Sequence, residues 1–153
     1  MNIQGSEISL VQEPKSLPRA PFSYKSLSQK DSIRLLLVQP ALSDDTIIRC
    51  SLIHTTISEC KDDIVEHYVA LSYTWGKLDR TKLILVDDLE YSVTDNLFSA
   101  LQDIRDSTRV LRLWADAICI NQHDEMEKMQ QISFMADIFS VARVTIIYLG
   151  PLD

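Results

Sequence analysis

An apolar run that ends abruptly in polar side chains constrains the fold of this chain more than any other feature. It spans residues 113–122 and reads LWADAICINQ. Such a run predicts a buried strand, over residues 110–115, that carries polar neighbours to the edge of a sheet. A helical pattern begins directly afterwards at Asp124, so the polar side chains fall in a strand-to-helix connection. Open α/β sheets usually place their ligand sites at such connections, and the sequence therefore predicts a site there.

Strand and helix patterns alternate in the second half of the chain, which predicts an α/β fold. Apolar residues at helical spacing predict one helix from Thr94 to about Asp106 and another from Asp124 to about Phe139. An acidic turn between residues 83–86 and 90–93 predicts a β-hairpin. The other strands are predicted at residues 33–38, 46–53, 67–74, 110–115 and 144–149. We expect a mostly parallel, doubly wound, flavodoxin-like sheet flanked by helices, with the hairpin as a small antiparallel excursion.

The first 32 residues differ in composition from the rest of the chain. They contain three prolines and seven serines with little periodicity, which is typical of a loosely ordered leader. We therefore divide the chain into a leader over residues 1–32 and a folded domain over residues 33–153. A chain of 153 residues buries roughly 68–70% of the surface that it exposes when unfolded, so a single domain can hold a substantial core.

Composition and charge argue against several classes of protein. With 46% hydrophobic and 24% charged residues, the chain is too apolar to be intrinsically disordered. Its net charge of −7 opposes phosphate backbones, so we expect no nucleic-acid binding. Its aliphatic runs are far shorter than the ~20 residues that cross a bilayer, and no targeting segment is recognisable. We therefore expect a cytoplasmic protein without a membrane span.

Several kinds of chemistry lack the residues that they require. The three cysteines are widely spaced, without a C-x-x-C pair, and the three histidines are scattered, so we predict no metal site and no disulfide framework. With only three glycines, the chain has neither G-x-G-x-x-G nor a phosphate loop, which argues against dehydrogenases and P-loop nucleotidases. Cys119 lies in an apolar run without a basic neighbour, which favours a buried thiol over a nucleophile.

Three sequence blocks resemble the fungal heterokaryon incompatibility domain, over roughly residues 33–150. The blocks are YVALSYTWG at residues 68–76, VTDNL at 93–97, and LWADAICINQ at 113–122, continued by Glu127, Gln131 and Met135 to the LG pair at 149–150. Most departures from the family's pattern are conservative. Lys128, however, stands where an arginine is common and lacks the planar guanidinium fork.

The resemblance implies a role in fungal non-self recognition, in which the domain is an effector of programmed cell death. The family is also distantly related in fold to Toll/interleukin-receptor domains, some of which cleave nicotinamide adenine dinucleotide (NAD) with a glutamate carried on a helix. That relation is one of fold, and a shared fold does not establish a shared reaction. Members usually carry this domain at the start of a much longer chain.

Glu127 is the carboxylate that an NAD glycohydrolase of this kind would use as its catalytic residue. A simpler explanation is also available, because Asp124 and Glu127 have the spacing of a helix capping box. In that arrangement Asp124 accepts a hydrogen bond from the Glu127 backbone while Glu127 reaches back. Both interpretations stay open at the level of sequence, since one carboxylate can serve a cap and a substrate.

The remaining candidates for substrate binding are Trp75, Gly76, Asp116, Asn121 and Gln122. Asp116 lies in an apolar strand, where its burial is costly unless its carboxylate is paired, either with backbone N–H groups or with a substrate. Asn121 and Gln122 can bind a ribose or an amide, although they can equally form a turn before the helix. Trp75 offers a stacking face beside a glycine that a ligand can approach closely, or it simply anchors the end of the sheet.

Two mechanisms are therefore compatible with a cell-death effector. In the first, a nucleotide such as NAD, which is a substrate rather than a cofactor, binds in a cleft lined by Trp75, Asp116, Asn121, Gln122 and Glu127. In the second, the domain has no chemistry of its own and signals by self-association or by docking a protein partner. The methionines of the last predicted helix, Met126, Met129 and Met135, suit such an adaptable interface, although they suit a core as well.

Overall fold

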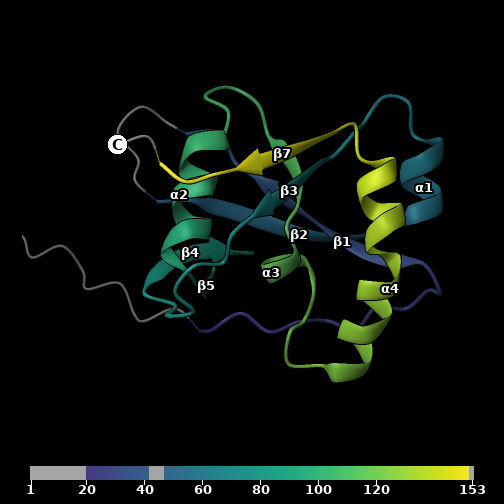
Figure 1. Cartoon of the computed structure of the whole chain (residues 1–153), viewed down its shortest axis with the longest axis horizontal. Coiled ribbons are helices and arrows are strands. Elements are labelled where there is room, and N and C mark those ends of the chain that lie inside the picture. Colours follow the sequence, from purple (N-terminus) through teal and green to yellow (C-terminus); the bar gives the residue numbers. More distant parts are fainter. Residues whose placement is uncertain (1–19, 42–46, 152–153) are drawn as a thin grey trace, which may run out of the picture.

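A computed structural model describes residues 20–41 and 47–151 of the chain (Figure 1). These residues form one mixed sheet of seven strands and four helices. In chain order the elements are β1 (Ser32–Val38), β2 (Arg49–Thr56), α1 (Ile57–Asp62), β3 (Val69–Tyr73), β4 (Lys82–Val86), β5 (Leu89–Val93), α2 (Asp95–Ile104), β6 (Leu111–Trp114), α3 (Asp116–Cys119), α4 (Glu125–Val141) and β7 (Val144–Tyr148). Most of the expected leader, residues 1–19, lies outside the described residues, as do residues 42–46.

The order of strands in the sheet is β5-β4-β2-β1-β6-β3-β7. Strand β1 runs antiparallel to both of its neighbours, β2 and β6, and β4 runs antiparallel to β5. The pairs β2–β4, β3–β6 and β3–β7 are parallel. The α/β class is confirmed, but the expected mostly parallel, doubly wound sheet is not, because the sheet is mixed and its longest ladder is antiparallel.

The reason for this error lies in the first half of the chain. A parallel pair of consecutive strands needs a crossover connection of a dozen or more residues, usually with a helix in it. Residues 39–48 separate β1 from β2 and include no helical pattern, so these two strands pair antiparallel along their whole length. The alternation of strands and helices that predicted a parallel sheet begins only later in the chain, and β3, β6 and β7 follow it.

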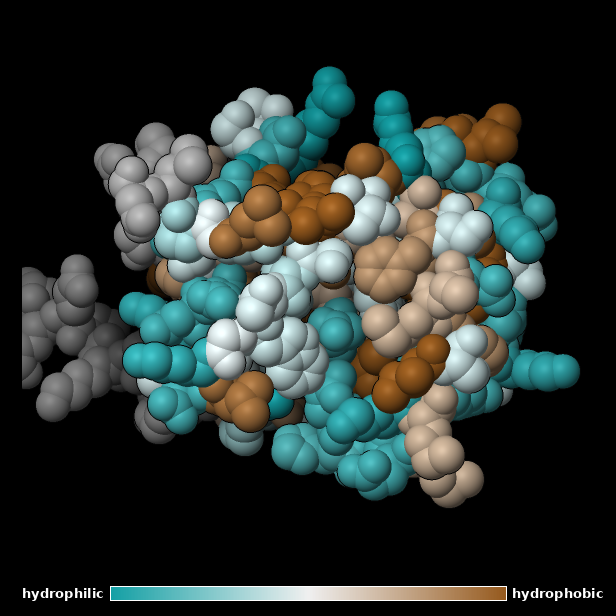
Figure 2. Space-filling view, in the orientation of Figure 1, coloured by the Kyte–Doolittle hydropathy of each residue, from teal (hydrophilic) through white to brown (hydrophobic). Residues whose placement is uncertain are grey.

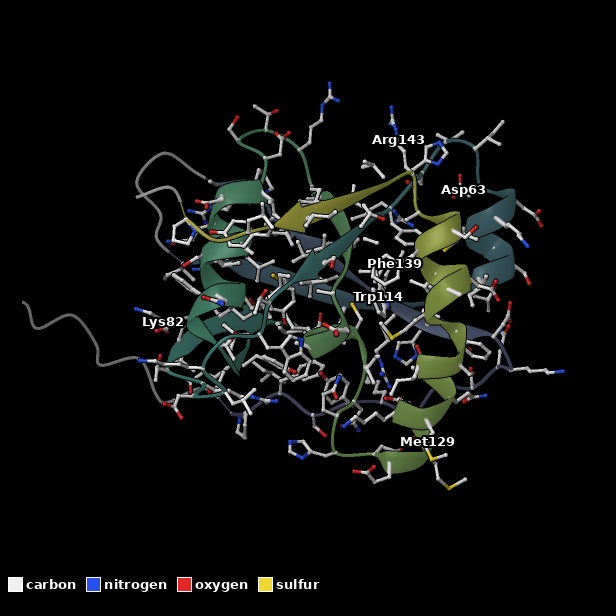
Figure 3. The ribbon with its side chains drawn as sticks, viewed as in Figure 1. Asp63, Lys82, Trp114, Met129, Phe139 and Arg143 are labelled. Carbon is white, nitrogen blue, oxygen red and sulfur yellow. The ribbon has the colours of Figure 1, made fainter. Side chains whose placement is uncertain are left out.

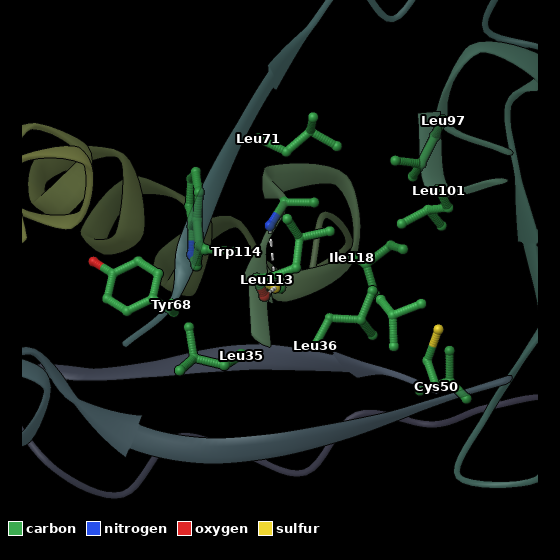
Figure 4. Packing of buried hydrophobic residues seen from close by; sticks show 14 of the residues in the cluster. Leu35, Leu36, Cys50, Tyr68, Leu71, Leu97, Leu101, Leu113, Trp114 and Ile118 are labelled. Atoms are coloured by element: carbon green, nitrogen blue, oxygen red, sulfur yellow. Dashed lines mark hydrogen bonds between the residues drawn. The ribbon is translucent and has the colours of Figure 1, made fainter. Parts of the chain in front are cut away.

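Helices cover both faces of the sheet, as expected (Figure 1). On one face, Trp114 of β6 packs edge-on against Phe139 of α4, with ring centroids 5.5 Å apart, and the Tyr68 hydroxyl donates a hydrogen bond to an α4 carbonyl. The other face carries α2 and α3. Figure 4 shows Tyr68 and Trp114 on the α4 side, with Leu97 and Leu101 of α2 at the opposite end of the cluster. β1 lies between these layers and is buried along almost its whole length.

Local signals in the sequence placed several elements correctly. The hairpin is present, and Asp87 and Asp88 have φ values of 51° and 63°, as a two-residue type I′ turn requires. Thr94 caps α2, since its hydroxyl accepts a hydrogen bond from the Leu97 N–H. The one-turn helix α3 was not predicted, because it continues the apolar run of β6 without a change in pattern. None of the helices in the described part of the chain is long and apolar enough to cross a membrane.

Candidate functional site

Arg34 is a fully buried cation in the middle of the fold, and the sequence analysis did not single it out. It lies in β1 with 0% exposure, and its Nη2 atom is 2.5 Å from Oε1 of Glu127 in α4. The same guanidinium donates to the backbone carbonyls of Lys25, at 2.8 Å, and Cys119, at 3.2 Å. It also lies 4.9 Å from the centre of the Tyr24 ring. Arg34 therefore links the segment before β1 to α3 and α4.

Glu127 uses both of its carboxylate oxygens within the protein. Oε1 is held by Arg34, and Oε2 accepts a hydrogen bond from the Asn121 N–H at 2.6 Å. The Asp124 carboxylate accepts from the Glu127 N–H at 3.1 Å, which confirms the expected helix cap. Glu127 reaches back to Asn121, three residues before the N-cap, rather than to Asp124 itself. The structure thus gives Glu127 a structural role, while its catalytic role stays a prediction.

Asn121 and Gln122 have their hydrogen bonds in the loop between α3 and α4. The Asn121 side-chain oxygen accepts from the His123 N–H at 3.2 Å, which closes a short turn. Gln122 donates through Nε2 to the Asp116 carbonyl at 3.0 Å. The alternative of a turn before the helix is therefore realised for Asn121. Substrate binding by either amide stays a prediction.

Asp116 and Trp75 come together where β3 and β6 end. Asp116 is the first residue of α3, and burial raises the pKa of its carboxyl above the ordinary value of 3.8. Hydrogen bonds from the Ala117 backbone and from the Trp75 side chain act in the opposite direction and offset part of that effect. These contacts bring together two of the predicted residues that lie 41 positions apart in the sequence.

A pocket of about 180 Å³ lies beside this pair. Its wall consists of Tyr73, Trp75, Leu78, Arg80, Tyr91, Ser92, Val93, Thr94, Leu97 and Ala117. It is smaller than the roughly 300–1,000 Å³ of typical ligand pockets, so it suits one aromatic ring rather than a whole dinucleotide. Burial raises the pKa of Tyr73, and the nearby Asp116 carboxylate raises it further. Burial also raises the pKa of Tyr91, so both tyrosines of the wall are neutral hydrogen-bonding groups at physiological pH.

Tyr73, Tyr91 and Arg80 line this pocket but were not among the predicted site residues. Tyr73 follows the rule of alternating strand faces, because it lines the pocket while its neighbour Ser72 is exposed. Tyr91 reaches the pocket from the hairpin, and Arg80 from the segment between β3 and β4. Only tertiary packing brings the hairpin to the end of β3, so no local signal could have found Tyr91.

Gly76 adopts a left-handed backbone with φ of 65°. The Asn96 side chain occupies the space that a Cβ atom at this position would need. The Asn96 side chain donates a hydrogen bond to the Thr74 carbonyl at 2.9 Å and so ties α2 to the end of β3. A Cβ atom at position 76 would stand 2.4 Å from Asn96 Nδ2. The close approach expected of a ligand at this glycine is thus made by a side chain of the protein.

Cys119 is fully buried, and burial raises the pKa of its thiol to about 12. Its sulfur accepts a hydrogen bond from the Ala115 N–H within the turn of α3. These features fit the predicted structural thiol. In residues 20–41 and 47–151, no group of His, Cys, Asp and Glu has an arrangement that could hold a metal ion.

Replacing Gly76 with alanine tests the contact with Asn96. We expect the Gly76→Ala variant to lose about 1–2 kcal/mol from the left-handed backbone alone, and more from the clash with Asn96. In the Gly76→Ala/Asn96→Ala variant the steric part disappears, so the two substitutions should be non-additive in urea unfolding. Strict additivity would show that Asn96 does not press on this position.

Removing one partner of the buried ion pair should be far more damaging than removing both. We expect Glu127→Ala to cost about 3–5 kcal/mol in unfolding free energy, because it leaves the Arg34 charge buried and unpaired. The double variant Arg34→Met/Glu127→Leu should cost much less than the sum of the two single substitutions. A Glu127→Ala protein as stable as the wild type in urea would contradict this role of the pair.

The raised pKa of Asp116 has a consequence for stability. Because the folded protein holds this proton more tightly, the unfolded state releases it first as pH rises above 3.8, and the wild type then loses stability. We expect Asp116→Asn, which keeps an oxygen acceptor for Trp75, to be more stable than the wild type at pH 7. The difference should vanish at pH 3. A melting-temperature series from pH 3 to pH 8 measures it, and a pH-independent difference would contradict the assignment.

Comparisons with known proteins agree with the resemblance seen in the sequence. The family model described as "Heterokaryon incompatibility protein (HET)" matches residues 68–153. The chain is also similar to heterokaryon incompatibility protein 6, OR allele, of Neurospora crassa, with 34% identity over 146 residues that cover 85% of this chain and 21% of the relative. The chain thus spans about a fifth of the length of that relative. No solved structure matches it. The chain belongs to the heterokaryon incompatibility family.

Proposed function

We propose that this domain is an effector of programmed cell death in fungal non-self recognition, acting in the cytoplasm. Membership of the heterokaryon incompatibility family supports the proposal, and so does the 34% identity to a Neurospora crassa protein named for that process. The match to the relative includes both the first strands and the polar connection after β6, because it covers 85% of the chain.

We further propose that the pocket beside Asp116 binds the nicotinamide end of NAD and promotes loss of the ring. The observation that carries this proposal is the carboxyl with a raised pKa that is bonded to a pocket-lining tryptophan. Perturbed carboxyls beside a cleft are common at catalytic sites. The aromatic wall suits a flat ring that carries positive charge, and Arg80 offers a cation for the phosphates of the same ligand.

Within this proposal the two acidic residues have different tasks. The ionised Asp116 carboxylate stabilises the positive charge that develops on the ribose as nicotinamide leaves, and it then accepts a proton from the attacking water. Glu127 holds the loop of Asn121 and Gln122 in place through the Arg34 ion pair and the Asn121 N–H. A direct catalytic role of Glu127, as the Toll/interleukin-receptor relation suggests, requires its carboxylate to leave Arg34.

Nicotinamide release from NAD by the purified domain tests the reaction. Asp116→Asn should remain folded and lose at least about 100-fold in rate, as expected for a missing general base. The matched control is Asp62→Asn, which neutralises an exposed carboxylate on α1 and should keep the wild-type rate. Equal rates of nicotinamide release in Asp116→Asn and wild type would show that Asp116 is not the general base. Glu127→Ala is a poorer probe, because it destabilises the fold.

A second candidate function is signalling by self-association, and the exposed apolar side chains favour it. Met126 and Met129 of α4 are 84% and 73% exposed, whereas Met135 packs against the core. Ile147 of the edge strand β7 is 69% exposed, and Figure 2 shows brown surface separated by polar residues on this face of the molecule. Absence of nicotinamide release, together with sedimentation that depends on protein concentration, would select this function over NAD cleavage.

A further inference from the structure

Four cationic or titratable side chains gather at the end of the sheet opposite the Trp75 pocket. Strands β6, β3 and β7 are parallel, so their amino-terminal ends meet at one edge. Arg109 and His67 stand just before β6 and β3, Arg143 stands directly before β7, and Arg112 lies within β6. All four line one cavity of about 390 Å³, which we call the arginine cleft. Figure 3 shows Arg143 at the turn between α4 and β7.

The carboxylates of the arginine cleft form an ion pair with only one of its arginines in the described structure. Glu66 pairs with Arg112 at 3.2 Å. The Asp106 carboxylate accepts hydrogen bonds within its own loop, from the Thr108 and Arg109 backbone N–H groups at 2.7 Å and 2.9 Å. Among the described residues, Arg143 and Arg109 form no ion pair. The cleft therefore holds three arginines against two carboxylates, in a chain whose net charge is −7.

Arg112 carries an unsatisfied donor in the same region. Its Nε atom is buried from solvent and has no hydrogen-bond partner in the described structure, although one of its terminal nitrogens is paired with Glu66. A buried donor without a partner costs roughly 1–3 kcal/mol, so native structures seldom leave one without a reason. Nearby, backbone hydrogen bonds from Glu66 and Val65 lower the pKa of the Asp63 carboxyl, and the charges of Arg112 and His67 add smaller contributions in the same direction.

The chemistry of the arginine cleft selects the kind of anion. A carboxylate carries one charge and is satisfied by a single bidentate guanidinium. Two guanidiniums without ion pairs, a third that is paired only with Glu66, and an imidazole favour a group with more charge and more acceptor oxygens. A phosphate group has both, and arginine is the residue most suited to recognise it. We propose that the arginine cleft binds a dianionic phosphate group.

This proposal is independent of the proposed NAD chemistry, because the two sites lie at opposite ends of the parallel strands. The probes are inorganic phosphate and pyrophosphate, titrated into the purified chain by calorimetry. We expect both anions to bind, and the Arg143→Gln and Arg109→Gln variants to bind at least about tenfold more weakly, since each removes charge-assisted hydrogen bonds. Both side chains are exposed, so the variants should melt at the wild-type temperature.

The matched control is Lys30→Gln, which removes one positive charge before β1, at the other end of the sheet. It should weaken binding less than twofold, because a distant surface charge is screened by salt. Nuclear magnetic resonance locates the anion, which should shift the His67 ring signals and leave the Trp75 indole signal in place. Absence of binding at millimolar anion, equal weakening by Lys30→Gln, or a shift confined to Trp75 would each overturn the proposal.

Discussion

The buried pair of Arg34 and Glu127 is the interaction on which the arrangement of the site depends. The two residues lie 93 positions apart in the sequence, and Arg34 Nη2 is 2.5 Å from Glu127 Oε1 in the fold. Burying two charges is costly, and the cost is offset only where further hydrogen bonds satisfy the remaining donors and acceptors. The carbonyls of Lys25 and Cys119 and the Asn121 N–H supply three such bonds, while Arg34 Nε is buried without a hydrogen-bond partner in the described structure. The pair thereby fixes the path from α3 to α4 around the end of the central strand.

Once that path is fixed, the other polar groups of the connection have defined places. Gln122 reaches back to the Asp116 carbonyl, and Asp116 meets Trp75 at the rim of the aromatic pocket. Burial raises the pKa of the Asp116 carboxyl, so its surroundings oppose ionisation, and ionising it lowers the stability of the fold. A group retained at such a cost fits a site selected for function rather than for stability. The left-handed Gly76 leaves room for the Asn96 side chain, which holds the segment with Trp75 against α2 through the Thr74 carbonyl.

The topology divides the sheet into two parts with different tasks. β1 and β2, antiparallel and buried, form the frame that carries Arg34. The parallel strands β6, β3 and β7 place the polar connection and the pocket at their carboxyl ends, where open α/β sheets usually bind ligands. Their amino-terminal ends hold the arginine cleft, so a single set of parallel strands carries both of the proposed binding sites.

The sequence by itself determined the features that depend on neighbouring residues. The Asp87–Asp88 turn, the Thr94 and Asp124 caps, and the family's motif blocks are all local, so pattern and capping chemistry suffice to place them. Strand direction, the partner of Glu127, and the joining of Tyr91 to Trp75 were decided only by the tertiary structure. They rest on contacts between residues far apart in the chain, whose energies depend on packing and desolvation rather than on local conformational preference.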